Sequence, residues 1–516
     1  MGFAQEVANF PREIGKAFKL NRKQALVFLT CWWCWTLGSM NFYLLPYTQP
    51  AVAKTLGVVT SKIAEANTTT MLSRAVGAAI FGVLSDQYGR KIPLVVDLVL
   101  MAVFTLSSGF VHTYGQFVAV RFLFGEYDLA ALYHTIWAVL TVVLGITYGA
   151  LYGVSMAAVL EAVPRESRGV VAGFTQQGFG AGNMIASGLH LAMENYGWRS
   201  LYYVGAGLTL TAVGLRIICP EYSVVTEAIR ENEDDLQVPG DGQGTLGATG
   251  ATLPFWVKFR YAIMRHWPIF IYCTVLTACF NTLGHGHMDV FPSFLQSQRG
   301  LSVLHETYIT VILQCGGILG GLVGGYLARY SPKWVPFGFA IALAPLLPAI
   351  ILPKKWQYLA VGSFFFEFCY GAAIGTIGNI LQMVCPHPGI RGAFGGVTYN
   401  LGNAISSVAP TIETRLGDDM PTKTGKPDYG RIILILVGIA IGLLSLTLAC
   451  MPIKNVNMEW DQEDPNQAIP AHEPPAKTIE HDQGHIEEAH DIETGATLKR
   501  AEQADVEYLE MSPTQK

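Results

Sequence analysis

The stretch Gly82-Val-Leu-Ser-Asp-Gln-Tyr-Gly-Arg-Lys91 decides the fold class, because it places a short charged turn between two long apolar segments. Asp86, Arg90 and the final lysine are costly to place in hydrocarbon. The turn therefore marks the water-facing end of a hairpin between two membrane helices. Its first glycine lets two helices approach closely, and Gly89 permits a sharp change of direction. The apolar flanks disfavour the alternative, a surface loop of a soluble protein.

The composition of the whole chain agrees with this prediction. The sequence of 516 residues is 51% hydrophobic and only 14% charged, whereas soluble proteins are typically about 25% charged. Apolar stretches of nearly bilayer-spanning length recur about twelve times, which predicts an all-α integral membrane protein. The predicted spans are residues 25–45, 66–84, 92–111, 115–162 (anomalously long), 169–191, 200–219, 267–288, 305–327, 334–353, 357–383, 390–412 and 431–452.

The chain divides into two halves around a polar stretch. The predicted parts are an N-terminal segment (1–24), a first six-helix bundle (25–219), a flexible linker (220–265), a second bundle (266–452) and a disordered acidic tail (453–516). A weaker echo of the opening turn, Gly324-Gly-Tyr-Leu-Ala-Arg-Tyr-Ser-Pro-Lys333, follows the eighth span, as expected of a duplicated unit. Most basic residues of the loops fall on one side of the membrane, with Lys354 and Lys355 opposite, and this bias predicts that both termini are cytoplasmic.

The predicted seventh span carries the densest polar chemistry. Asn281, His285 and Asp289 are spaced i, i+4 and i+8, so they form one stripe along a helix. A histidine four residues before an aspartate can share a proton with it, and such a pair can bind a carboxylate and a proton together. The alternative is a helix end at the membrane surface, with His287 and Asp289 solvated.

The opening turn resembles the loop after the second helix in the major facilitator superfamily. The seventh span resembles the signature of one branch, the fungal monocarboxylate/proton symporters or lactate permeases. Asn281, His285 and Asp289 match that signature, while Gly284, His287 and Met288 depart from it. The resemblance implies the major facilitator fold, with twelve transmembrane helices in two six-helix bundles. It also implies proton-coupled uptake of lactate- or pyruvate-like anions by alternating access.

The same resemblance extends to the eleventh span and fails in the first. Asn403 matches the family's Tyr-Gln-Leu-Gly-Asn element, and Asn400 stands where glutamine is usual. In the first span the branch often carries an acidic residue, where this chain has Asn41, which cannot titrate. This departure leaves open an exporter of a larger organic acid, drug or secondary metabolite.

Four further polar residues inside spans are candidates for substrate or proton binding. Arg121 matches the superfamily's arginine in the fourth span, where it would hold a carboxylate or else snorkel to the interface. Glu367 lies in the middle of a span, as a proton carrier or a structural partner. The amides of Gln176 and Gln177 would line a cavity, while the neighbouring glycines serve helix packing.

Glu161, Arg165 and Arg168 form a charged group after the fourth span. Together with the opening turn they predict a cytoplasmic gate or packing network away from the substrate.

One segment has no counterpart in the predicted fold. The sequence that resembles the family runs to Gly125 and resumes at Gly145. Residues 126–144 would add one membrane crossing, which would reverse the orientation of every later helix. The residues at the ends of this segment can be encoded by codons that resemble the donor, branch-point and acceptor sites of an intron. A retained in-frame intron of roughly 60 nucleotides is therefore one explanation. A genuine interfacial or re-entrant insertion is the other.

No phosphate-binding loop or nucleophile–histidine–acid set is present, so the sequence predicts neither an ATP-driven pump nor an enzyme. We expect a multi-pass protein of the plasma membrane that acts as a monomer, with no cofactor, resident metal or nucleic-acid partner. Its partners are the lipid membrane, a small monocarboxylate and H⁺. A transport-dead nutrient sensor that signals through the acidic tail is the alternative from another class.

Overall fold

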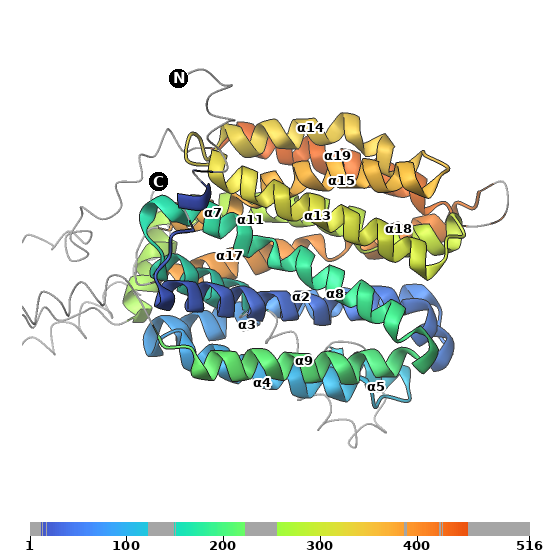
Figure 1. The fold of residues 1–516 in the computed structure, drawn as a ribbon, viewed down its shortest axis with the longest axis horizontal. Helices are drawn as coiled ribbons and strands as arrows, with labels where there is room; N and C mark the ends of the chain where they lie inside the picture. The colour runs from blue at the N-terminus through green and yellow to red at the C-terminus, as the bar shows by residue number, and fades with distance from the viewer. Residues whose placement is uncertain are drawn as a thin grey trace, which may run out of the picture. The chain divides into compact units, whose positions relative to one another are not determined.

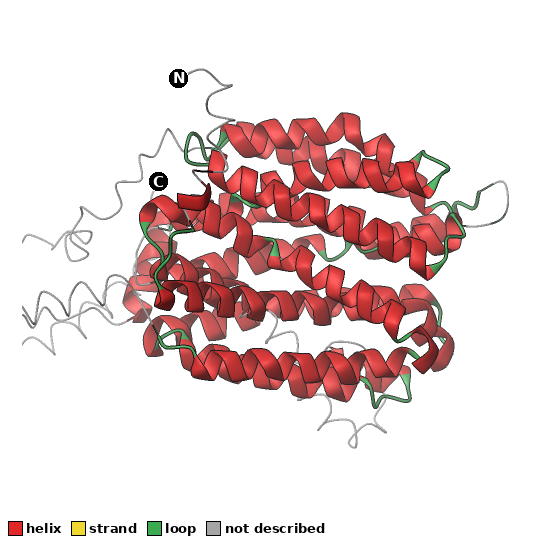
Figure 2. Cartoon of the chain, in the orientation of Figure 1, coloured by secondary structure: helices red, strands yellow, loops and turns green. Residues whose placement is uncertain are grey.

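The computed structural model describes residues 12, 14–16, 18–121, 149, 151–221, 255–385, 390–422, 425 and 427–451. Helices account for nearly all of this part of the chain, as Figure 2 shows. The only extended pairing among these residues is one isolated bridge between Pro421 and Pro427. The all-α prediction is therefore confirmed.

The described helices follow the predicted spans closely. In chain order they are α2 (Arg22–Leu56), α3 (Thr60–Tyr88), α4 (Lys91–Ser108), α5 (Tyr114–Arg121), an unlabelled helix Leu151–Ala162, α7 (Arg165–Gln176), α8 (Gly178–Ala192), η2 (Glu194–Tyr196), α9 (Trp198–Ile218), α11 (Phe255–Met288), α12 (Phe291–Ser293), η3 (Phe294–Gln298), α13 (Val303–Leu327), α14 (Trp334–Ile351), α15 (Trp356–Ile374), α16 (Ile377–Met383), α17 (Arg391–Ser406), α18 (Ala409–Asp419) and α19 (Tyr429–Ala449).

Seven helical segments of the described chain are long and apolar enough to cross a membrane. They are Lys91–Ser108, Trp198–Ile218, His266–Gln298, Val303–Leu327, Trp334–Ile351, Trp356–Met383 and Tyr429–Ala449. The helices α2 and α3, of 35 and 29 residues, contain the predicted spans 25–45 and 66–84.

Two features of the chain differ from the simple pattern of spans. Residues 255–265, which the composition predicts as part of the linker, are helical and belong to α11. The helix is interrupted at His266, whose φ of −119° and ψ of 24° are not helical, so the membrane segment starts there. The predicted insertion 126–144 lies outside the described residues, between α5 and the helix Leu151–Ala162.

Helices from the two halves of the chain pack against one another along two crossings (Figure 1). In the first, α3 packs along α17, and a Cβ added at Gly82 would lie 2.8 Å from the Ala393 Cα. In the second, α7 packs along α13, and a Cβ added at Gly169 would lie 2.6 Å from the Gly325 carbonyl oxygen. Both distances are shorter than real Cβ contacts, so only glycine allows these backbones to come so close.

Within each half, the remaining helices cover these crossings. In the first half α2 packs on α8 and α9, and α4 packs on α9. In the second half α15 packs between α13 and α14, and α19 packs on α11 and α14. The buried side of α11 is thereby held between α17 and α19, and this places its polar stripe inside the protein.

Candidate functional site

The predicted polar stripe of α11 is buried and hydrogen-bonded. His285 contacts Asp289 through Nδ1 and Oδ2 at 3.0 Å, and it contacts Asn403 of α17 through Nε2 and Oδ1 at 3.2 Å. Asn281, one turn earlier, donates to the Tyr399 carbonyl at 3.4 Å. The structure therefore brings together four residues that the sequence assigned to the site: Asn281, His285, Asp289 and Asn403.

The hydrogen bonds fix how many protons this group carries. Asn403 donates its amide to the Tyr399 carbonyl at 3.3 Å, so its Oδ1 accepts from Nε2–H of His285. The contact between Nδ1 and Asp289 then needs one more proton, on the ring or on the carboxyl group. In either form the pair is neutral, which is how a buried histidine and aspartate avoid an uncompensated charge.

A buried cation from the first half faces the same place. The guanidinium of Arg74, on α3, lies over the Phe42 ring at 4.7 Å, and the His285 ring meets that ring edge-on at 5.8 Å. Arg74 and His285 thus lie against one aromatic ring from opposite halves of the chain. Sequence reasoning missed Arg74, although an arginine inside the predicted span 66–84 is itself a signal of function.

Tyr399 of α17 joins the two halves beside this group. Its hydroxyl accepts from Gln176 at 3.3 Å, and its ring stacks on Tyr152 at 3.7 Å. Trp35 of α2 meets the same two tyrosines and donates to the Gln176 carbonyl at 3.3 Å. Gln176 is therefore at the boundary between the halves.

Two amides that the sequence singled out hold helices together instead of facing the α11 group. Asn400 donates to the Gly149 carbonyl at 3.0 Å and to the Gly396 carbonyl at 2.9 Å. Asn41 donates to the Leu37 carbonyl at 3.0 Å and to Thr209 at 2.7 Å. The asparagine that replaces the branch's acidic residue thus joins α2 to α9 within the first half.

A second histidine–carboxylate pair lies on another face of α11. His287 contacts Glu367 of α15 through Nε2 and Oε2 at 2.7 Å, and its Nδ1 contacts the Leu283 carbonyl at 2.6 Å. Both side chains are fully buried. The alternative of a solvated helix end for His287 and Asp289 is therefore wrong, since both are inside the protein.

Glu413 is a further carboxylate that the sequence reasoning missed. It lies on α18, is fully buried, and has no hydrogen-bond partner for either oxygen within the described part of the chain. A Cβ added at Gly286 of α11 would lie 3.2 Å from its Oε1. Glu413 follows the predicted span 390–412 by one residue, so the sequence alone placed it at the membrane surface.

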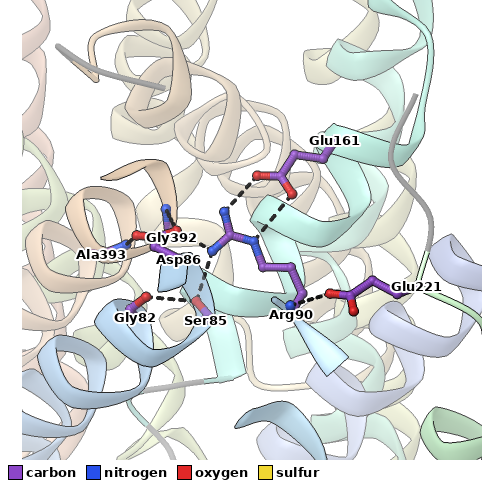
Figure 3. Close-up of polar contacts among 8 residues, drawn as sticks. All are labelled: Gly82, Ser85, Asp86, Arg90, Glu161, Glu221, Gly392 and Ala393. Atoms are coloured by element: carbon purple, nitrogen blue, oxygen red, sulfur yellow. Dashed lines mark hydrogen bonds and ion pairs between the residues drawn. The ribbon is translucent and has the colours of Figure 1, made fainter. Parts of the chain in front are cut away.

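The predicted gate residues of the opening turn form one charged cluster (Figure 3). Arg90 donates to Glu161 at 2.7 and 3.3 Å and to Ser85 at 2.9 Å, and it also pairs with Asp86. Asp86 accepts from the backbone N–H groups of Gly392 and Ala393 at 3.2 and 2.9 Å. Burial lowers the pKa of Arg90, but Glu161 and Asp86 outweigh it, so the pKa stands above its ordinary value.

Asp86 therefore links the two halves at the start of α17. The first N–H groups of a helix lack intrahelical acceptors, and its N-terminus favours an anion. Gly89 ends α3 with a φ of 86°, and its neighbour Arg90 donates its backbone N–H to Glu221 at 2.6 Å. Arg168 donates to the Leu160 carbonyl at 3.1 Å, which ties α7 to the preceding helix.

Four predicted residues complete the account. Gln177 donates to the Gly371 carbonyl of α15 at 3.2 Å, a further link between the halves. Lys91 begins α4. Arg121 ends α5 and Arg165 begins α7, but the positions of their side chains lie outside what the structure describes.

Comparisons with known proteins agree with this architecture. The family model of the Major Facilitator Superfamily matches residues 129–410, and that of the sugar (and other) transporters matches residues 25–225. The carboxylic acid transporter protein homolog of Saccharomyces cerevisiae is 25% identical over 85% of this chain and 69% of its own length. The cis,cis-muconate transport protein of Acinetobacter baylyi is 25% identical over 75% of this chain and 86% of its own.

A solved structure shows the same fold. The human organic anion transporter MFSD10 (TETRAN) superposes with a TM-score of 0.59 at 12% identity, over 83% of this chain and 99% of its own. The chain is thus a multi-pass membrane transporter and not an enzyme. Its family match covers more than half of its length, and the chain belongs to the major facilitator superfamily.

Proposed function

We propose that the protein transports a small monocarboxylate together with a proton, by alternating access between its two halves. One observation carries the proposal: Arg74 and His285 lie against the same Phe42 ring from opposite halves, and His285 contacts Asp289 at 3.0 Å. A guanidinium recognises a carboxylate with two parallel N–H donors. The yeast and bacterial relatives, whose names state carboxylic acid and muconate transport, support a carboxylate as the substrate.

In this proposal each group has one task. Arg74 holds the substrate carboxylate, and the amides of Asn281 and Asn403 orient it. His285 and Asp289 hold the proton that crosses with it, which compensates the negative charge of the anion. Binding of both ligands lets the halves rock about their glycine crossings, and the Asp86–Arg90–Glu161 cluster acts as the gate on the cytoplasmic side.

The arrangement of basic residues supports cytoplasmic termini. We also propose two six-helix bundles, joined by the polar segment between α9 and α11, that work as one monomer in the plasma membrane.

Uptake of labelled lactate, pyruvate and acetate tests the function in cells that lack their own carriers. We expect uptake of at least one acid, faster at pH 5 than at pH 7. His285→Ala should abolish that uptake while the protein stays in the membrane. Thr447→Val, at a half-buried position of α19 whose hydroxyl contacts Cys279 of α11, is the matched control and should transport normally.

The proposal fails if His285→Ala transports at the normal rate with an unchanged pH dependence. Lower internal acid in expressing cells than in controls would indicate efflux instead. Loss of a cellular response on deletion of residues 453–516, with no flux in the intact protein, would indicate a sensor.

A further inference from the structure

The proposed substrate site leaves the pair His287–Glu367 unused. The two side chains join α11 to α15 through a hydrogen bond of 2.7 Å. We infer that this pair is a second proton carrier, so that two protons cross with each monocarboxylate anion. The inference rests on the proposed function. It adds the ratio of protons to anions and the net charge that each transport cycle moves.

The first step is the proton count. The Leu283 carbonyl can only accept, so Nδ1 of His287 carries an N–H that donates to it at 2.6 Å. The 2.7 Å contact between Nε2 and Oε2 then requires one more proton, held by the imidazolium or by the carboxylic acid. The pair is neutral with this proton and negative without it.

The second step is what loss of that proton does. Without it, the Nε2 lone pair faces an ionised carboxylate, and the two repel. If the ring instead keeps its hydrogen on Nε2, a bare Nδ1 faces the Leu283 carbonyl oxygen. Deprotonation therefore breaks one of the two contacts in either tautomer, and it disturbs the packing of α11 on α15.

The third step is position. Gln177, from the first half, donates to Gly371 one turn beyond Glu367. A Cβ added at Gly317 of α13 would lie 3.2 Å from Oε1 of Glu367 and 3.4 Å from Oε1 of Gln177, so the two side chains are neighbours. The pair thus lies beside a contact between the halves, where a change in packing can bias their rocking.

The other titratable groups around the pair are few. Tyr370 of α15 meets the His287 ring edge-on at 4.9 Å. Tyr43 of α2 is within electrostatic reach of both Glu367 and Asp289, and its hydroxyl donates to the Met288 sulfur at 3.1 Å. Near the pair, α13 presents Gly317, and Gln177 lies at the junction of α7 and α8; neither titrates. The buried carboxyl group of Glu413 is also near, because its Oε1 would lie 3.2 Å from a Cβ added at Gly286, the residue before His287. Among these groups, His287 and Glu367 contact each other directly.

Charge movement tests the inference. One proton with one anion moves no net charge, whereas two protons move one positive charge. We would reconstitute the full-length protein in liposomes and set the membrane potential with potassium and valinomycin at a fixed pH gradient. Steady-state accumulation of the labelled acid by the wild type should rise about fifty-fold for each 100 mV, inside negative. Glu367→Gln keeps the shape of the side chain, so it should still accumulate the acid under a pH gradient but ignore the potential.

Ser363→Ala, one turn earlier on α15 and also buried, is the matched control and should respond like the wild type. His287→Gln is the second variant, in case Glu367→Gln does not fold; size-exclusion profiles in detergent decide that point. Wild-type accumulation that follows the pH gradient but not the potential would overturn the inference and leave the proposed function intact. Transport without any response to the pH gradient would instead overturn the proposed function.

Discussion

Asp86→Asn should weaken the contact between the halves at the charged cluster of Figure 3. The carboxylate is 1% exposed and accepts from the Gly392 and Ala393 N–H groups, which have no acceptor inside α17. A hydrogen bond to a charged group contributes ~1.5–3 kcal/mol and a neutral one ~0.5–1.5, so two weakened bonds amount to about 2 kcal/mol. Opening at this end should therefore become about 30 times more favourable.

Hydrogen exchange measures this opening directly and needs no substrate. Under conditions where closing is faster than chemical exchange, the amide protection at the start of α17 reports the free energy of opening. We expect the amides of Gly392 and Ala393 to exchange about 30-fold faster in Asp86→Asn. Peptides from α19 should exchange as in the wild type.

Glu221→Gln is the matched control for the same cluster. Glu221 accepts from the Arg90 backbone but makes its contact within the first half of the chain, so its loss should leave the α17 amides unchanged. If Asp86→Asn leaves their exchange within twofold of the wild type, Asp86 does not hold the gate, and the reasoning from its hydrogen bonds is refuted.

Three further predictions follow from other residues. Arg74→Lys should raise the apparent KM for the acid about tenfold with little change in surface expression, because lysine lacks the planar two-donor fork; an unchanged KM would remove Arg74 from the site. Asn41→Asp should lower the unfolding temperature in detergent by several degrees, because a carboxyl group cannot make both hydrogen bonds that the buried amide donates. It should not add a coupled proton, and an unchanged unfolding temperature would contradict the prediction. Mature cDNA should lack the codons for residues 126–144, and a main transcript that keeps them would refute the intron.

The fold and part of the site could be predicted from the sequence because the signals are local. A helix in hydrocarbon must be apolar along its length, so the spans are visible one by one. The i, i+4 spacing of His285 and Asp289 also predicted their contact, which the structure shows at 3.0 Å. The resemblance supplied Asn403, which lies on a different helix.

The remaining contacts depend on which helix faces which, and no local pattern contains that information. Arg74 and Phe42 meet because α3 packs against α2, and His287 meets Glu367 because α11 packs against α15. The i, i+2 spacing of His285 and His287 shows only that they face different sides of α11. Asn41 shows in addition that a polar residue in a span can serve helix packing, here by a hydrogen bond from α2 to Thr209 of α9.

The echo of the opening turn shows how a duplicated unit becomes asymmetric in chemistry. Gly324, which aligns with Gly82, packs against Ala372 of α15, and the next residue, Gly325, makes the glycine contact at the crossing of α13 with α7. The position equivalent to Asp86, however, is Ala328, and the neighbouring Arg329 lies over Tyr326 and Tyr330 at 3.9 and 4.8 Å, within its own half. The echo therefore supplies no carboxylate to cap the facing helix. Because the α7–α13 crossing has no such carboxylate cap, we expect the α3–α17 crossing to contribute the larger part of the free energy of opening at this end.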